Sequence, residues 1–361
     1  MLGRKRRLVL LAEGHFAPGE AKTAVGVLRY RPEEVVAVLD STHAGRTAAD
    51  CVGVGGGVPV LAELDAAAAR GADSILIGIA PQGGELPPAW RALVNDALSR
   101  RWDVLSGLHA FLGDDPEFRE RARASGAAIH DVRRPPAGKP VAAARAAGLD
   151  ALVALTVGSD CNVGKMTAAL EIRAALEARG VRAAFVATGQ TGIFVADQGA
   201  AIDAIPADFV AGTVEKLVLE AARDADIVLV EGQGALHHPG YSGVTLSLLH
   251  GACPSALILC HQSDHALIHY GRPGDAPRPV ASLPALVRVY ESAAAWVHPA
   301  RALGVALHTA ALAEPAARAA CAAAAAETGL PATDPVRFGA EALAQALIAA
   351  LESRRRRATS A

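Results

Sequence analysis

Short apolar runs alternate with longer segments of helical periodicity along the first part of the chain. The runs are typical of buried strands and lie at Leu8–Ala12, Val35–Asp40, Ser74–Ile79, Asp103–Ser106 and Ala127–Asp131. The helical patterns between them cover Lys22–Arg29, Leu61–Arg70, Pro88–Arg101 and Pro116–Ala124. Strands that alternate in this way with helices predict an α/β fold with a parallel, doubly wound sheet.

The same alternation continues in the second part of the chain. Its predicted strands are Leu152–Val157, Arg182–Ala187, Asp226–Val230, Ala256–Gln262 and Val305–Thr309. Between the two parts, the prolines and charges of Arg133–Pro140 interrupt any regular element and favour a linker. We therefore predict two domains, residues 1–148 and 149–353, followed by a solvated basic tail at 354–361.

The strongest chemical signal is the loop that joins the strand Leu152–Val157 to a helix beginning near Thr167. A strand, a glycine-bounded loop and a helix N-terminus together form a phosphate cradle, because loop N–H groups, the helix dipole and a lysine all face the anion. The predicted phosphate-binding residues are Gly158, Asp160, Asn162, Val163, Gly164, Lys165, Met166 and Thr167.

This loop departs from the common nucleotide-binding pattern in two ways. Five residues, rather than four, separate Gly158 from Gly164, and Met166 follows the lysine where a Ser or Thr hydroxyl usually binds Mg²⁺. A thioether is a poor ligand for this hard cation. Thr167 points about 100° away from position 166 on a helix. The pattern therefore indicates phosphate binding more strongly than nucleotide hydrolysis.

A second signal follows the strand Asp226–Val230, which ends in Glu231 and the glycine-rich turn Gly232–Gly234. In phosphate-loop proteins, a carboxylate at this position lies near the metal or the reacting group. His237 and His238 come next, and an imidazole suits a general base because its ordinary pKa is near neutrality. A purely structural loop is the alternative. We predict no metal site, because adjacent histidines splay apart and no third ligand is obvious.

Three further residues are candidates for substrate binding. Gln190 lies in a polar segment after the strand Arg182–Ala187, and ligands of α/β proteins bind at the carboxyl ends of strands. Gln233 and Tyr241 flank the histidine pair. The glycine-rich run Gly53–Val58 lacks the spacing of a dinucleotide fingerprint, so we favour a structural loop there, with ligand contact as the alternative.

Composition narrows the class of protein. The chain has 361 residues and a formal charge of −2, which gives no argument for a nucleic-acid surface. Its five cysteines form no CxxC pair and no evident grouping with histidine, and an odd count favours a reduced, cytoplasmic setting over a disulfide framework.

The hydrophobic segments give no sign of export or membrane insertion. The basic run Arg4–Arg7 and the apolar run Leu8–Ala12 superficially resemble a signal peptide, but Glu13 ends the apolar stretch too early. No segment approaches the ~20 apolar residues of a membrane span. We expect a cytoplasmic protein with a small-molecule substrate and leave a homo-oligomer open.

Taken together, the motifs are similar to those of a two-domain family long described as being of unknown function. They are Gly78-Ile79-Ala80-Pro81-Gln82-Gly83-Gly84, Ser106-Gly107-Leu108-His109, Gly158 to Thr167, Ala187 to Gly192, Val230 to Gly234 and Thr333-Asp334-Pro335-Val336-Arg337. Members have a Rossmann-like N-terminal domain and a P-loop NTPase-like C-terminal domain, and they include bacterial D-glutamate N-acetyltransferases. The C-terminal half also resembles dethiobiotin synthetases, which have Thr where Met166 stands here.

The resemblance implies an enzyme that moves an acetyl group from acetyl-CoA to the amino group of an acidic amino acid, D-glutamate in that family. Glu231, His237 and His238 are then the catalytic candidates, and the backbone N–H groups of Gly232–Gly234 are candidates for the oxyanion hole. One alternative is an ATP/Mg²⁺-dependent ligase or kinase of the dethiobiotin-synthetase type, with Thr167 and Glu231 near the metal. A non-enzymatic nucleotide-binding regulator is the other.

Overall fold

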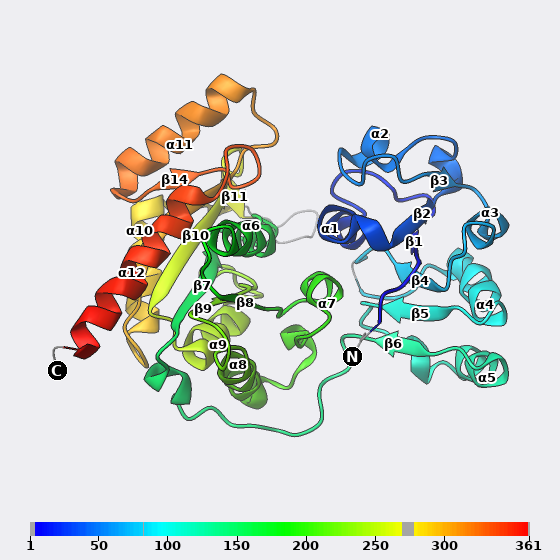
Figure 1. Ribbon diagram of the computed structural model, residues 1–361, viewed down its shortest axis with the longest axis horizontal. Coiled ribbons are helices and arrows are strands. Elements are labelled where there is room, and N and C mark those ends of the chain that lie inside the picture. The colour runs from blue at the N-terminus through cyan, green and yellow to red at the C-terminus, as the bar shows by residue number, and fades with distance from the viewer. Residues whose placement is uncertain (1–3, 82, 269–277, 360–361) are drawn as a thin grey trace. The chain divides into compact units, whose positions relative to one another are not determined.

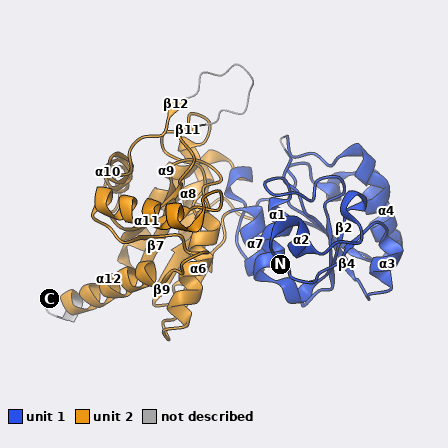
Figure 2. Ribbon diagram, turned by 90° about the horizontal axis from the view of Figure 1, so that it is seen from above, with its two compact units in different colours: residues 1–136, 189–204 blue, residues 137–188, 205–361 orange. Residues whose placement is uncertain are grey.

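The computed structural model describes residues 4–81, 83–268 and 278–359, so Gln82 of the first family motif lies outside the described residues. The chain forms two compact units, shown in different colours in Figure 2. Unit 1 contains residues 1–136 and 189–204, and unit 2 contains residues 137–188 and 205–361. The first break lies within the segment that we interpreted as a linker. The segment 189–204, which the sequence analysis assigned to the second domain, belongs to unit 1.

Unit 1 is built on a six-stranded parallel sheet with the strand order β3-β2-β1-β4-β5-β6 (Figure 1). Its strands are β1 Leu8–Leu11, β2 Val35–Leu39, β3 Val60–Leu61, β4 Ser74–Ile77, β5 Asp103–Ser106 and β6 Ile129–Asp131. Its helices are α1 Lys22–Tyr30, α2 Ala48–Val52, α3 Leu64–Ala68, α4 Arg91–Ser99, α5 Pro116–Ser125 and α7 Gln190–Ala196. This order is that of a Rossmann-like sheet and confirms the predicted doubly wound class.

The apolar runs form this sheet because they are buried on both faces. All four residues of β1 and of β4 are buried, and side chains such as Val9, Ile75 and Val104 belong to one core with Trp90. The sequence analysis missed β3 and α2, which are too short to show a period. It also predicted a helix over Leu61–Arg70 that is longer than the observed α3, because Leu61 pairs with β2 instead.

Unit 2 has a second six-stranded parallel sheet, with the order β14-β13-β10-β7-β9-β8. Its strands are β7 Leu152–Gly158, β8 Ala183–Val186, β9 Ile227–Val230, β10 Ala256–Gln262, β13 Arg301–His308 and β14 Ala332–Thr333. Its helices are α6 Lys165–Glu177, α8 Ala207–Ala221, α9 Ser242–Ala252, α10 Leu283–Ala294, α11 Glu314–Thr328 and α12 Glu341–Thr359. A separate antiparallel pair consists of β11 Leu267–Ile268 and β12 Arg278–Pro279. None of the helices in the described ranges is both long enough and apolar enough to span a membrane.

The predicted basic tail is not a separate segment, because helix α12 continues through the four arginines. Arg354 donates to Ser255 Oγ at 2.9 Å and to the carbonyl of Leu149. Arg355 pairs with Asp226 at 2.5 Å. Leu149, Asp226 and Ser255 all lie just before strands of the sheet. The helix therefore carries Arg354 and Arg355 to the amino edge of that sheet, whereas Arg356 and Arg357 are exposed and contact residues of the helix itself.

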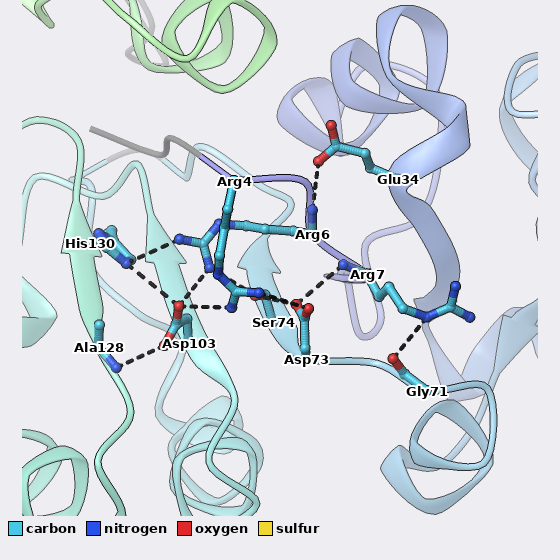
Figure 3. A network of polar contacts seen from close by, with 10 residues as sticks. All are labelled: Arg4, Arg6, Arg7, Glu34, Gly71, Asp73, Ser74, Asp103, Ala128 and His130. Carbon is cyan, nitrogen blue, oxygen red and sulfur yellow. Dashed lines mark hydrogen bonds and ion pairs between the residues drawn. The ribbon is translucent and has the colours of Figure 1, made fainter.

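At the amino edge of the unit 1 sheet, the N-terminal arginines form a polar network with Asp103 at its centre (Figure 3). Arg6 is buried and donates to Asp103 at 2.6 Å and to Ser74 at 3.0 Å. Arg4 bridges Asp103 at 3.1 Å and Asp73 at 2.9 Å. Burial alone would raise the pKa of Asp103, but the hydrogen bonds from Arg6, the Ala128 backbone and Arg4 hold that pKa below its ordinary value. The basic run thus anchors β1 to its neighbours.

We predict that Asp103→Asn lowers the stability of unit 1 by about 2–4 kcal/mol near pH 7, because it leaves the buried Arg6 cation without its charge partner. The pKa of Asp103 is depressed in the folded state. Its stabilising contribution is therefore present above the unfolded pKa and is lost as the pH falls through the folded pKa. Urea unfolding should accordingly show a smaller difference between variant and wild type at about pH 3.

Asp96→Asn is the matched control for this prediction, since it removes a carboxylate from an exposed pair with Arg100 on α4. That change should cost no more than about 0.5 kcal/mol. Equal losses in the two variants would contradict the role assigned to Asp103.

Candidate functional site

The loop between β7 and α6 has the shape of a phosphate cradle. All seven residues of β7 are buried, and the loop then turns sharply at Gly158. A Cβ added there would lie 2.8 Å from both the Asp160 carbonyl oxygen and the Lys165 Nζ, so only glycine fits. Gly164 caps α6 with φ +90°, and Asn162 has φ +58°. The backbone therefore folds tightly around the position where an anion binds.

The side chain of Lys165 lies inside this cradle. Its Nζ donates to the carbonyl of Asp160 at 2.7 Å, and only 7% of the residue is exposed. Burial lowers the pKa of the Lys165 ammonium, although the nearby Cys161, Cys260, Asp160 and Glu231 act in the opposite direction. An anion bound in the loop would therefore compensate a desolvated positive charge.

Three other predicted loop residues lie at the start of α6. Val163 is buried, with 2% of its surface exposed, and its side chain lies close to Gly158. Met166 and Thr167 are half-buried in the first turn of the helix. The residue next to the lysine on this helix is thus a thioether and not a hydroxyl.

The carboxyl ends of three strands meet beside the loop. Glu231 follows β9 and is 4% exposed, and its carboxylate accepts the backbone N–H of Thr188 at 2.8 Å. Thr188 returns a hydrogen bond from its hydroxyl to the Glu231 carbonyl at 2.7 Å. The N–H of Gly232 donates to Thr156 Oγ1 on β7 at 2.9 Å. Because this N–H already donates to Thr156, it is not available for an oxyanion, and its assignment to the oxyanion hole was wrong. The N–H groups of Gln233 and Gly234 remain candidates for that role.

The predicted substrate-binding residues lie in two different units. In unit 2, Gln233 donates to Thr188 Oγ1 at 3.3 Å, and Tyr241 is 53% exposed. Gln190 is the first residue of α7 and belongs to unit 1, where it packs against Gly107. A Cβ on Gly107 would lie 2.8 Å from the Cγ of Gln190, so Gln190 and the Ser106–His109 motif form one packed group.

The two histidines after β9 occupy different environments. In the described part of the chain, neither ring nitrogen of His237 has a hydrogen-bond partner, although both atoms are buried. Burial lowers the pKa of His237, with weaker opposing effects from the Ser159 backbone and Asp160. His238 is 5% exposed, accepts the Gly240 N–H on Nδ1 at 3.1 Å and stacks on Tyr241 with ring centroids 4.6 Å apart.

The structure also brings together a cysteine, a histidine and a carboxylate that sequence reasoning did not connect. Ligand atoms of Asp160, Cys161 and His238 all lie within 4.8 Å of one another. His265 pairs with the second carboxylate oxygen of Asp160 at 2.7 Å. The cysteine spacing in the sequence showed no grouping with histidine, but the fold places Cys161 next to His238. The residues meet because β7 lies between β9 and β10 in the sheet, and the loops after all three strands converge.

A buried tyrosine, also missed, links the phosphate loop to the histidine segment. The Tyr290 hydroxyl donates to the Gly158 carbonyl at 2.7 Å and accepts the Leu236 N–H at 3.1 Å. Burial raises the pKa of this hydroxyl. Leu236 also lines an apolar pocket of about 570 Å³ between α9 and α10, whose other lining residues include Ser242, Arg288 and Trp296. A single tyrosine within helix α10 gave no sequence signal for this role.

In unit 1, the glycine-rich run Gly53–Val58 is a packed turn. Gly55 has φ +82°, and a Cβ there would lie 2.6 Å from a methyl group of Leu28, which confirms the structural interpretation. Asp40, at the end of β2, is fully buried and accepts the N–H groups of Gly14 and Phe16, each at 3.2 Å. Burial alone would raise its pKa, but hydrogen bonds from Thr42, His43 and the Gly14 N–H hold that pKa below the ordinary value.

Comparison with known proteins gives matches along both parts of the chain. A family model described as "Domain of unknown function (DUF1611_C) P-loop domain" matches residues 140–344, and its partner, described as "Domain of unknown function (DUF1611_N) Rossmann-like domain", matches residues 41–135. A D-glutamate N-acetyltransferase from Tritonibacter scottomollicae is 37% identical over 334 residues, which is 91% of this chain and 94% of the relative.

Two further proteins are similar to this chain. A D-glutamate N-acetyltransferase from a Pseudoalteromonas species is 30% identical over 282 residues, covering 77% of this chain and 82% of the relative. The crystal structure of a DUF1611 family protein from Anabaena variabilis has a TM-score of 0.89 and 37% identity, and the match covers 95% of this chain and 99% of that one.

We predict that Gly232→Ala disrupts the site, because the new methyl group would lie 1.8 Å from the Thr156 carbonyl oxygen and 3.0 Å from the Lys165 Cδ. The strand ends must separate to relieve this clash, so we expect a loss of about 3 kcal/mol or more in urea unfolding. Gly243→Ala is the matched control, because nothing lies within 4 Å of its added methyl and alanine favours the helix. Equal stability of the two variants would contradict this view of the Gly232–Thr156 contact.

Proposed function

The chain belongs to the DUF1611 family, and from this premise we propose that it is an N-acetyltransferase that moves acetyl from acetyl-CoA to the amino group of an acidic amino acid, D-glutamate in the first instance. Two relatives that carry the name D-glutamate N-acetyltransferase support the reaction. We choose acetyl-CoA as the acetyl donor because of the phosphate loop, in which Lys165 is buried and is followed by Met166.

A loop of this kind suits a carrier that bears phosphates without transferring them. Coenzyme A contains a pyrophosphate and a 3′-phosphate, either of which could accept the loop N–H groups and pair with the buried Lys165 ammonium. In an ATP-dependent enzyme, a hydroxyl after the lysine would hold Mg²⁺, and Met166 supplies none. The carboxylate of Glu231, which was the other candidate ligand, accepts the Thr188 N–H.

The histidine segment supplies the acid–base chemistry in this proposal. Acetyl transfer requires a neutral amine and donors directed at the oxyanion of the tetrahedral intermediate. We assign the base to His237, because its lowered pKa keeps the imidazole neutral near pH 7 and its ring nitrogens have no partner among the described residues. In this proposal, the N–H groups of Gln233 and Gly234 stabilise the oxyanion.

The pocket that begins at Leu236 provides room for the uncharged part of the carrier. Its volume of about 570 Å³ is typical of small-molecule sites, and its lining is mostly apolar. Such a lining suits the pantetheine arm better than a dicarboxylic amino acid, which needs charged partners for both carboxylates.

We predict that the purified protein releases CoA thiol from acetyl-CoA in the presence of D-glutamate, and that the rate falls with amino acids lacking a side-chain carboxylate. A thiol-reagent assay over D- and L-glutamate, D- and L-aspartate and neutral amino acids checks this. Absence of turnover with every acidic amino acid would exclude the proposal. Release of ADP from ATP and Mg²⁺ in the presence of a small carboxylate would favour a ligase or kinase instead. Tight nucleotide binding without turnover in either assay would favour a non-enzymatic regulator.

We predict that Lys165→Ala raises the KM for acetyl-CoA by about 10-fold or more, with a smaller effect on kcat, because the lysine pairs with a carrier phosphate in both the ground and transition states. Lys216→Ala is the control, since Lys216 is exposed on α8 and pairs only loosely with Glu220 at 3.9 Å. An unchanged KM in a folded Lys165→Ala variant would count against phosphate binding by this loop.

A further inference from the structure

We propose that Cys161 is the nucleophile of this reaction and carries the acetyl group as a thioester between two half-reactions, with His238 as a hydrogen-bond donor that positions the thiolate. This inference rests on the proposed function, because the acetyl donor is acetyl-CoA. The observation behind it is the cluster at the tip of the phosphate loop, where a ring nitrogen of His238 lies within 4.8 Å of the Cys161 sulfur.

The loop places the Cys161 sulfur close to positive charge. The residue lies four positions before the first residue of α6, a helix of 13 residues whose N-terminus carries a partial positive charge. The charges of Cys161 and Lys165 interact, since Cys161 opposes the drop in the lysine pKa. Cys161 is only half-buried. A partly exposed thiol in an electropositive loop is the setting of reactive cysteines.

The other four cysteines lack this setting. Burial raises the pKa of Cys51, Cys253 and Cys321. Cys260 also interacts with Lys165, but it is fully buried at the end of β10, and burial raises its pKa to about 12. Chemical reactivity at neutral pH should therefore concentrate at Cys161.

Two contacts fix the tautomer and the orientation of the His238 ring. The Gly240 N–H points at Nδ1, so the neutral ring carries its proton on Nε2. Stacking on Tyr241 fixes the plane of the ring. The charge of Asp160 would oppose a thiolate, but its carboxylate accepts the Cys161 N–H at 2.7 Å and pairs with His265 at 2.7 Å.

The same contacts argue against reading the cluster as a metal site. A zinc ion requires a lone pair from histidine and one from the carboxylate. The Nδ1 lone pair receives the Gly240 N–H, so the neutral ring of His238 has no lone pair left for a metal, and the Asp160 carboxylate is shared with the Cys161 N–H and His265. The geometry therefore favours a thiolate with polar support, and metal binding becomes one outcome of the test.

The two steps balance without another reactant. In the first, the Cys161 sulfur attacks the acetyl carbonyl, the new C–S bond forms, and the C–S bond to CoA breaks. The electron pair leaves with the CoA sulfur, which takes a proton from water. In the second, the substrate amine attacks the Cys161 thioester, the C–N bond forms, His237 takes the amine proton, and the Cys161 thiolate leaves.

The experiment incubates the full-length protein with acetyl-CoA alone and measures its intact mass. We expect one added acetyl group on the peptide that contains Cys161, release of one CoA per protein, removal by neutral hydroxylamine and discharge by D-glutamate. Initial rates should give parallel lines of ping-pong kinetics. Cys161→Ser should lose the adduct and lower kcat by about 1,000-fold or more. Cys51→Ser, a half-buried cysteine of unit 1, is the matched control and should retain both.

Other results would overturn the inference and leave the function standing. Acetyl transfer with intersecting lines, no adduct and an active Cys161→Ser variant would do so. Stoichiometric Zn²⁺ binding that requires Cys161 and His238 would assign the cluster to a metal. If the Cys161→Ser variant does not fold, iodoacetamide alkylation of the wild type replaces it as the test. Prior incubation with acetyl-CoA should block modification of Cys161, and unchanged modification would overturn the inference. An adduct that no amine discharges would support Cys161 as nucleophile and instead count against the proposed function.

Discussion

The close approach of Gly232 to the carbonyl of Thr156 is the constraint on which the site depends. No side chain fits between these two strand ends, and the Gly232 N–H binds the Thr156 hydroxyl. The end of β9 therefore packs directly against β7, and the segment from Glu231 to His238 begins beside the phosphate loop. A wider separation would move the histidines away from Lys165 and the cysteine, and the loop would remain an anion cradle without acid–base groups.

Much of the fold could be predicted from the sequence, because its signals are local. Buried strands show as apolar runs, and the phosphate loop shows as two glycines and a lysine at fixed spacing. The Asp160–Cys161–His238 cluster could not be predicted, since it depends on β7 lying between β9 and β10. The anchoring of Arg354 and Arg355 likewise depends on where α12 ends relative to the sheet. Local patterns carry no information on strand order.

Unit 1 has the strand order of a dinucleotide-binding sheet, but its acidic residue after the second strand has a structural role. Its strand order is that of dinucleotide-binding sheets, in which an acidic residue near the end of the second strand commonly binds a ribose hydroxyl. Here that residue, Asp40, holds the loop after β1 through Gly14 and Phe16 and also binds Thr42 and His43. A ribose would have to displace these internal donors. The strand order is therefore not by itself an argument for dinucleotide binding by unit 1.

In unit 2, too, carboxylates at a position that often binds a ligand are bound to other groups of the protein. In a nucleotide hydrolase, carboxylates near the loop bind the metal that activates the phosphates. Here Asp160 is bound to His265 and the Cys161 backbone, and Glu231 is bound to the Thr188 backbone. Protein donors thus compete with a hard cation for these carboxylates, and a bound anion would compensate the desolvated charge of Lys165. In the proposed reaction, a phosphate of the carrier and the thiolate of Cys161 would both be stabilised by the positive charge of this one loop, so carrier binding and nucleophile activation would be coupled.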